Sequence, residues 1–187
     1  MAKLRLFLSL NPSAGIISEL EKIQNRLKEL YLEQKIRWEE PEKLHLTLRF
    51  LGDTDELNVT PLLDTLNRLK FDFEKIIFET ERVGFFPNNR YPNVIYTGLI
   101  EKGNNSDKLV GFIDRIIYNF GVKPDKRFIP HITLGRFSRN KRIKITQARD
   151  ISIEKFSIEF DSFCLMKSRL TPSGSVYETI NKINFRK

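Results

Sequence analysis

The first half of the chain combines alternating and helical patterns of hydrophobic residues. Residues 3–10 carry leucine at every second position, which predicts a strand with one buried face. Asn11-Pro12 is typical of a helix start, and apolar residues at helical spacing predict that this helix continues to about Gln34. Residues 44–51 predict a second strand, and Thr60-Pro61 predicts the start of a second helix.

The second half mixes strands and helices in a similar way, with a turn-rich stretch at residues 86–90 and a glycine stop at Gly121. Each half shows the order strand, helix, strand, which indicates an internal duplication. The mixture without strict alternation predicts an α+β fold with largely antiparallel sheets. The elements predicted in this half are strands at about 74–83 and 94–100, a helix at 106–120, and strands from 131, at 156–167 and at 175–185.

Composition limits the class of protein. The chain has 187 residues, 40% hydrophobic and 30% charged, which is typical of a soluble globular protein. No apolar run reaches the roughly 18–20 residues that cross a membrane, and Lys3 and Arg5 interrupt the apolar start, so we expect neither a membrane span nor a signal peptide. One cysteine, Cys164, and two histidines exclude an internal disulfide and a four-ligand structural zinc site. We therefore expect a cytoplasmic protein. Because the sequence shows no evident exposed apolar stripe, we also expect a monomer.

Positive charge is concentrated in residues 121–149. This segment holds nine basic residues against one acidic residue, Asp125, so its net charge of +8 equals that of the whole chain. Such a zone favours a phosphate-bearing partner such as RNA. A solvated, lysine-rich and arginine-rich surface is the alternative, and charge alone leaves both open.

The two histidines of the chain lie in the same short motif, His-x-Thr-Leu, at His45 and at His131. Both motifs fall in predicted strands, where successive side chains point to opposite faces. His45 and Thr47 therefore share one face, as do His131 and Thr133. The pattern predicts that two imidazoles and two hydroxyls meet in a common cleft.

Two other interpretations compete with a shared chemical role. A single histidine in a strand is commonly structural, but here both histidines are followed by the same x-Thr-Leu. A metal site is the other alternative, although the chain has no His-x-x-x-His motif and no histidine–carboxylate cluster at ligand spacing. We therefore predict no metal site.

Two imidazoles suit a displacement at phosphorus. Imidazole titrates near neutral pH, so one ring can act as a base while the other acts as an acid. Threonine hydroxyls and a cation would hold the non-bridging oxygens as negative charge develops. The near-symmetry of the motifs leaves open which histidine takes which role.

Cations and aromatic residues near the motifs are further candidates. Arg49 lies on the face of His45 if the strand alternates regularly, which makes it a candidate phosphate ligand. Arg136 lies opposite His131 under the same rule, so its phosphate role needs a bulge, a strand end or a long reach. Three aromatic residues are candidates for stacking a terminal base, although an aromatic residue is more often part of a core. They are Phe86, Tyr91 and Tyr177.

The paired motifs resemble the signature of the two-histidine (2H) phosphoesterase superfamily. The chain is most similar to its RNA 2′,3′-cyclic phosphodiesterase branch, historically called 2′-5′ RNA ligase, and the similarity covers essentially all 187 residues. Beyond the opening strand, the blocks that carry it are residues 38–52, 84–98, 128–136 and 168–177.

This resemblance implies a single bilobal α+β domain over residues 1–187, in which two antiparallel sheets face a central cleft and helices pack outside. It also implies hydrolysis of an RNA 2′,3′-cyclic phosphate to a 2′-phosphate without a metal or other cofactor. By matching position, His45 would donate a proton to the 3′ oxygen and His131 would accept one from water. Thr47 and Thr133 would bind the phosphate.

Two alternatives remain beside hydrolysis. The same site could join a cyclic phosphate to a 5′-hydroxyl through a 2′-5′ bond, because both reactions are displacements at one phosphorus. A non-catalytic RNA-binding protein is the alternative from another class, and it depends on the basic zone at 121–149. The expected partners are RNA ends or nucleotides that carry a cyclic phosphate, with tRNA among the candidates.

Overall fold

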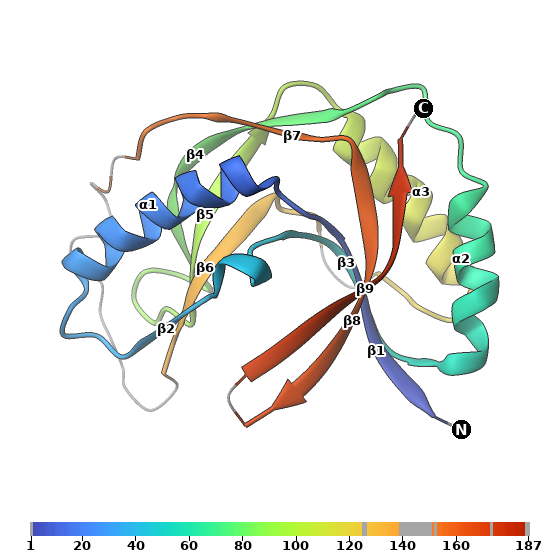
Figure 1. The fold of residues 1–187 in the computed structure, drawn as a ribbon, viewed down its shortest axis with the longest axis horizontal. Coiled ribbons are helices and arrows are strands. Elements are labelled where there is room, and N and C mark those ends of the chain that lie inside the picture. The colour runs from blue at the N-terminus through green and yellow to red at the C-terminus, as the bar shows by residue number, and fades with distance from the viewer. Residues whose placement is uncertain (1, 125–126, 139–150, 152, 173, 186–187) are drawn as a thin grey trace.

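The computed structural model describes residues 2–124, 127–138, 151, 153–172 and 174–185 (Figure 1). Much of the predicted basic zone at 121–149 therefore lies outside the described residues. Three α-helices occupy Ala14–Leu30 (α1), Val59–Asn67 (α2) and Asn105–Asn119 (α3), and short 3-10 turns occupy Pro41–Lys43 (η1) and Glu56–Asn58 (η2).

The strands of the described chain form one curled sheet in which every pairing is antiparallel. Their order is β7-β4-β5-β6-β3-β1-β8-β9, and β2 pairs with β6. The predicted α+β class with antiparallel strands is confirmed. The strands are Lys3–Leu10 (β1), Ile36–Trp38 (β2), Leu46–Asp55 (β3), Ile76–Phe86 (β4), Val94–Glu101 (β5), His131–Phe137 (β6), Ser157–Phe160 (β7), Ser162–Thr171 (β8) and Gly174–Asn184 (β9).

The sheet divides into two halves that correspond to the two sheets expected. One half contains β3, β1, β8 and β9, and the other contains β7, β4, β5, β6 and β2. The halves meet where β3 and β6 pair, through the single residue pair Leu46 and Ile132. The two histidine motifs therefore begin at the junction, one on each side.

The predicted long strand at 156–167 is two strands. β7 pairs with β4 in one half of the sheet, whereas β8 pairs with β1 in the other half. The chain changes halves at Asp161, a bend between the two strands, and this change of partner breaks the strand (Figure 1). Other bounds also differ from the sequence analysis: α1 ends at Leu30, β3 continues to Asp55 and β4 continues to Phe86. The short β2 was not predicted.

The predicted duplication is visible in the topology. The units β1-α1-β3 and β5-α3-β6 each join two neighbouring antiparallel strands through a helix. Each helix packs against the half of the sheet to which the other unit belongs (Figure 1). Gln24 of α1 donates to the Leu134 carbonyl on β6, and Asp114 of α3 accepts from Arg49 on β3. The two halves are therefore interlocked by their helices.

The helices cover one face of the sheet, and the main hydrophobic core lies between them. The motif residues Leu46, Leu48, Ile132 and Leu134 are all buried in that core. Burial of one such side chain contributes about 1.5–3 kcal/mol, so the core holds both motif strands firmly. Within the described chain, no helix has the length and apolar character needed to cross a membrane.

Candidate active site

Each motif strand contains a bulge at the leucine of His-x-Thr-Leu. In the pairing of β1 with β3, Ser9 is opposite Thr47 and Leu8 is opposite Arg49, so Leu48 is an extra residue. In the pairing of β5 with β6, Tyr96 is opposite Thr133 and Ile95 is opposite Gly135, so Leu134 is an extra residue. An extra residue reverses the alternation of side chains beyond it.

Because of the bulges, each of the two arginines lies on the opposite face of the sheet to the one that regular alternation predicts. Arg136 lies on the face of His131, so the bulge that its phosphate role needed is present. The prediction that Arg49 shares the face of His45 is wrong, because the bulge turns Arg49 toward α3. There its Nε and Nη2 donate to the two carboxylate oxygens of Asp114, at 2.6 and 2.9 Å.

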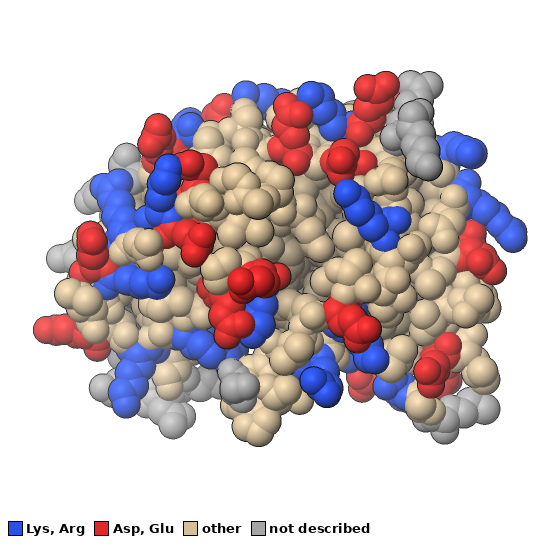
Figure 2. All heavy atoms as spheres, viewed as in Figure 1, with Lys and Arg blue, Asp and Glu red and all other residues tan. Residues whose placement is uncertain are grey.

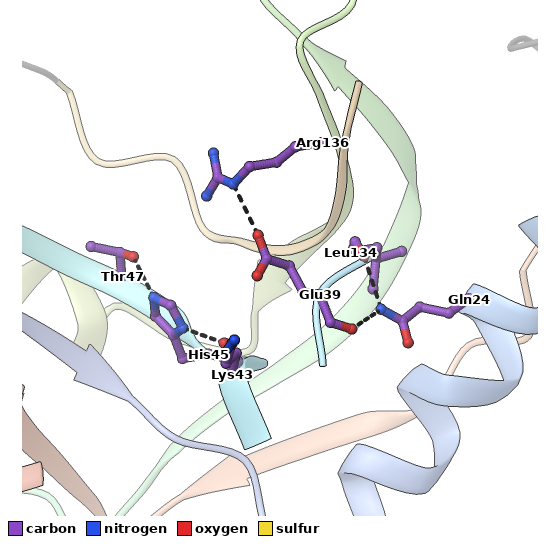
Figure 3. Close-up of polar contacts among 7 residues, drawn as sticks. All are labelled: Gln24, Glu39, Lys43, His45, Thr47, Leu134 and Arg136. Atoms are coloured by element: carbon purple, nitrogen blue, oxygen red, sulfur yellow. Dashed lines mark hydrogen bonds and ion pairs between the residues drawn. The ribbon is translucent and has the colours of Figure 1, made fainter. Parts of the chain in front are cut away.

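The two histidines are held in the same way. Nδ1 of His45 lies 2.6 Å from the carbonyl oxygen of Lys43, and Nδ1 of His131 lies 2.7 Å from that of Ile129. A carbonyl oxygen only accepts, so Nδ1 carries a proton in both rings and Nε2 is the nitrogen that gains or loses one. Nε2 of His45 also lies 3.1 Å from Oγ1 of Thr47 (Figure 3).

The two motifs face each other across the junction of the sheet. Because Leu46 is paired with Ile132, extending the antiparallel register by one residue sets His45 opposite Thr133 and Thr47 opposite His131. The electrostatic influence of His131 on His45 agrees with this proximity. The structure thus brings together the four motif residues that the sequence analysis predicted.

Aromatic rings border each imidazole. The ring centroid of His45 lies 5.1 Å from that of Phe7 and 5.3 Å from that of Tyr177. The ring centroid of His131 lies 5.0 Å from that of Phe86 and 5.3 Å from that of Tyr96, and these two aromatic rings stack on each other. Two of the three predicted stacking residues, Phe86 and Tyr177, therefore lie at the histidines.

The third, Tyr91, is exposed and lies beside Arg90, without a ring contact to either histidine. The sequence analysis missed Phe7 and Tyr96. Phe7 left a signal, because it is an aromatic residue on the otherwise polar face of the strand at 3–10. The position of Tyr96 depends on Gly84 of β4, because a Cβ atom at Gly84 would collide with the tyrosine ring.

A polar network missed by the sequence analysis approaches His45 from β2. Nε of Arg136 donates to a carboxylate oxygen of Glu39 at 2.9 Å (Figure 3). The buried side chain of Gln24 donates through Nε2 to the carbonyl oxygens of Glu39 and Leu134, both at 2.8 Å. No sequence signal pointed to Glu39, because the three-residue strand that precedes it is too short to show a period.

Burial lowers the pKa of both histidines below the ordinary value of 6.5. The carbonyl that accepts from each Nδ1 opposes this effect. The positive charge of Arg136 also lowers the pKa of both rings, so its guanidinium is within electrostatic reach of both. The carboxylate of Glu39 raises the pKa of His45.

On the face shown in Figure 2, lysine and arginine residues are interspersed with acidic ones and do not form a single basic area. Among the residues that the structure describes, no three His, Cys, Asp or Glu side chains gather in a group able to hold a metal ion.

Relatives match the chain over nearly its full length. It is 32% identical over 184 residues to the RNA 2′,3′-cyclic phosphodiesterase of Methanocaldococcus jannaschii, covering 96% of this chain and 99% of that one. It is 34% identical over 178 residues to the protein of the same name from Archaeoglobus fulgidus, covering 95% and 98%.

Solved structures share the fold. TT0787 of Thermus thermophilus superposes with a TM-score of 0.75 at 24% identity, over 98% of each chain. Escherichia coli LigT in its apo form superposes with a TM-score of 0.76 at 20% identity, over the full length of both chains. The model of the family described as "LigT like Phosphoesterase" matches residues 10–96 and 101–177, which include both histidine motifs. The chain therefore belongs to the LigT-like phosphoesterase family of the 2H superfamily.

Proposed function

We propose that this protein hydrolyses the 2′,3′-cyclic phosphate at the end of an RNA to a 2′-phosphate. One observation carries the proposal: each histidine anchors Nδ1 on a backbone carbonyl, which leaves Nε2 of both rings for proton transfer. The names of the relatives from Methanocaldococcus jannaschii and Archaeoglobus fulgidus support RNA as the substrate class. A tRNA substrate, the monomeric state and the cytoplasmic location stay predictions.

The reaction needs one proton acceptor and one proton donor. Nε2 of neutral His131 accepts a proton from water as the water oxygen attacks phosphorus. The bond from phosphorus to the 3′ oxygen breaks, and Nε2 of protonated His45 donates its proton to that oxygen. Water is consumed, a 2′-phosphate and a 3′-hydroxyl are formed, and the two rings end with their protonation states exchanged.

In this scheme three side chains bind the phosphate oxygens. Arg136 supplies a positive charge within reach of both rings. The hydroxyl of Thr47 lies beside Nε2 of His45, and that of Thr133 has no hydrogen-bond partner among the described residues. Donors positioned before the reaction stabilise the charge that accumulates on the non-bridging oxygens. Metal ions take no part in this scheme.

The test uses an RNA oligomer that ends in 2′,3′-cyclic phosphate, incubated with the protein in excess chelator. Phosphorus NMR should show a 2′-phosphate accumulating. A 3′-phosphate product would contradict the assigned bond cleavage, and a requirement for added metal would contradict the metal-independent scheme. Adding a 5′-hydroxyl RNA tests the ligation alternative, which predicts a longer product. RNA that binds and stays unchanged would favour the binding alternative.

A further inference from the structure

Glu39 is a carboxylate enclosed in the site, and the reaction scheme above gives it no role. Its side chain is only 12% exposed, and its oxygen accepts from Nε of Arg136 at 2.9 Å. In Figure 3 the two terminal nitrogens of Arg136 point away from Glu39. The carboxylate thus holds one nitrogen of the guanidinium and leaves the other two available to a phosphate.

The backbone of Glu39 is fixed at the bulge of β6. Its N–H donates to the Leu134 carbonyl at 2.9 Å, directly after the three pairs that join β2 to β6. The same carbonyl and that of Glu39 both accept from the buried Gln24 amide, at 2.8 Å. Because one amide connects α1, β2 and the bulge, the carboxylate is held at a fixed place relative to Arg136.

The electrostatic effect of Glu39 is unequal for the two histidines. Besides burial and the Lys43 carbonyl, the groups that act on His45 are Glu39, which favours its charged form, and Arg136 and His131, which disfavour it. The Tyr177 phenol ring also borders His45. On the preceding turn, the Lys43 ammonium is paired with Glu40 at 2.8 Å. The pKa of His131 is lowered by burial and by Arg136 and raised by the Ile129 carbonyl. No carboxylate of the described residues is among these causes.

We propose that Glu39 is a positioning residue that orients Arg136 toward the phosphate and makes His45, not His131, the proton donor. The two motifs share their sequence and the anchoring of each Nδ1 on a backbone carbonyl, so a carboxylate that acts on one ring can distinguish the acid from the base. The catalytic part of this inference rests on the proposed function. The electrostatic part does not, since it concerns only the protonation of two rings.

The test is an NMR titration of the imidazole signals in wild type and in Glu39→Gln. The chain has only two histidines, so each signal is assigned by its loss in His45→Ala or His131→Ala. In Glu39→Gln the pKa of His45 should fall while that of His131 changes less, because the substitution removes the carboxylate that favours the charged form of His45. One limb of the kcat/KM pH profile should move to lower pH by the same amount.

Glu40→Gln is the matched control. Glu40 is the next residue and is also paired with a cation, but it is exposed and its partner is Lys43. Neither histidine pKa should change in this variant. An unchanged His45 pKa in Glu39→Gln, or equal shifts of both histidines, would overturn the inference.

Glu39→Asp separates orientation from charge, and it also serves if Glu39→Gln fails to fold. Aspartate keeps the negative charge but shortens the reach to Arg136, so KM for the cyclic phosphate should rise several-fold while the pKa of His45 stays near its wild-type value. A wild-type KM would contradict the orienting role. If wild-type protein fails to hydrolyse the RNA, the proposed function falls, while the NMR titration still decides the electrostatic claim.

Discussion

The two histidine motifs share a sequence and a backbone bulge, yet they place different side chains in the site. In both, the residue directly after the bulged leucine faces the helices and the next one faces the histidines. The helix-facing position holds Arg49 in the first motif and Gly135 in the second. The histidine-facing position holds Phe50, which is 66% exposed, in the first and Arg136 in the second. A shift of one position beyond a bulge thus decides whether an arginine pairs with a helix, as Arg49 does, or faces the histidines, as Arg136 does.

Replacing either histidine tests what the two motifs have in common. His45→Ala and His131→Ala each remove a proton carrier, so each should lower kcat by about 10²–10⁴-fold. The affinity for an RNA with a cyclic phosphate should change little, because neither ring is the main source of positive charge. Turnover assays and equilibrium binding measure the two quantities. Full activity in either variant would exclude the paired mechanism.

The arginines provide the sharpest contrast between the motifs. Arg136→Ala should lower kcat/KM by about 10²-fold, since it removes a donor aimed at developing charge. Arg49→Ala should leave kcat/KM within a few-fold of wild type but lower the free energy of unfolding by about 1–3 kcal/mol, because it breaks a partly buried pair with Asp114. Urea unfolding and steady-state kinetics on both variants measure these effects. The opposite pattern would show that the bulges do not turn the side chains as described.

Tyr177 and Tyr91 test the aromatic residues in the same manner. Tyr177→Ala removes a ring beside His45 and should raise KM for RNA about tenfold if the ring stacks on a base. Tyr91→Ala is the control, because this exposed ring contacts neither histidine and its loss should leave KM unchanged. Equal effects of the two substitutions would remove the basis for a stacking role at His45.

A smaller effect is expected in the pH dependence of the free energy of unfolding. Burial lowers the pKa of both histidines in the folded state, so the unfolded chain binds more protons below its own pKa of about 6.5. Stability is therefore fully present above about pH 6.5 and declines as the pH falls below it. Urea unfolding at pH 7.5 and 5.5 should show this loss in wild type and a smaller loss in a variant with both histidines replaced by alanine. An identical loss in both proteins would contradict the lowered pKa values.

The sequence predicted the motif residues well because regular alternation is enough to set His45 beside Thr47 and His131 beside Thr133. It failed for Arg49 because a bulge at Leu48 leaves the pattern of apolar residues unchanged: the extra leucine still enters the core. The break at Asp161 was hidden for a similar reason, since an uninterrupted strand pattern does not reveal a change of partner. The place of Glu39 in the site could not be predicted from the local sequence, because it depends on pairing with β6, nearly a hundred residues away.

The exchange of helices between the halves determines whether one repeat could fold on its own. A chain that contained only β1, α1 and β3 would leave the apolar face of those strands bare, because α3 covers it in the intact protein and α1 packs elsewhere. We therefore expect that one repeat does not fold alone. Two separate copies would bury their apolar sheet faces only if each covered the other with its helix. This exchange of helices within one polypeptide resembles the exchange of an element between the two chains of a domain-swapped dimer. A change that disrupts this helix exchange should therefore both destabilise the fold and separate the two histidines.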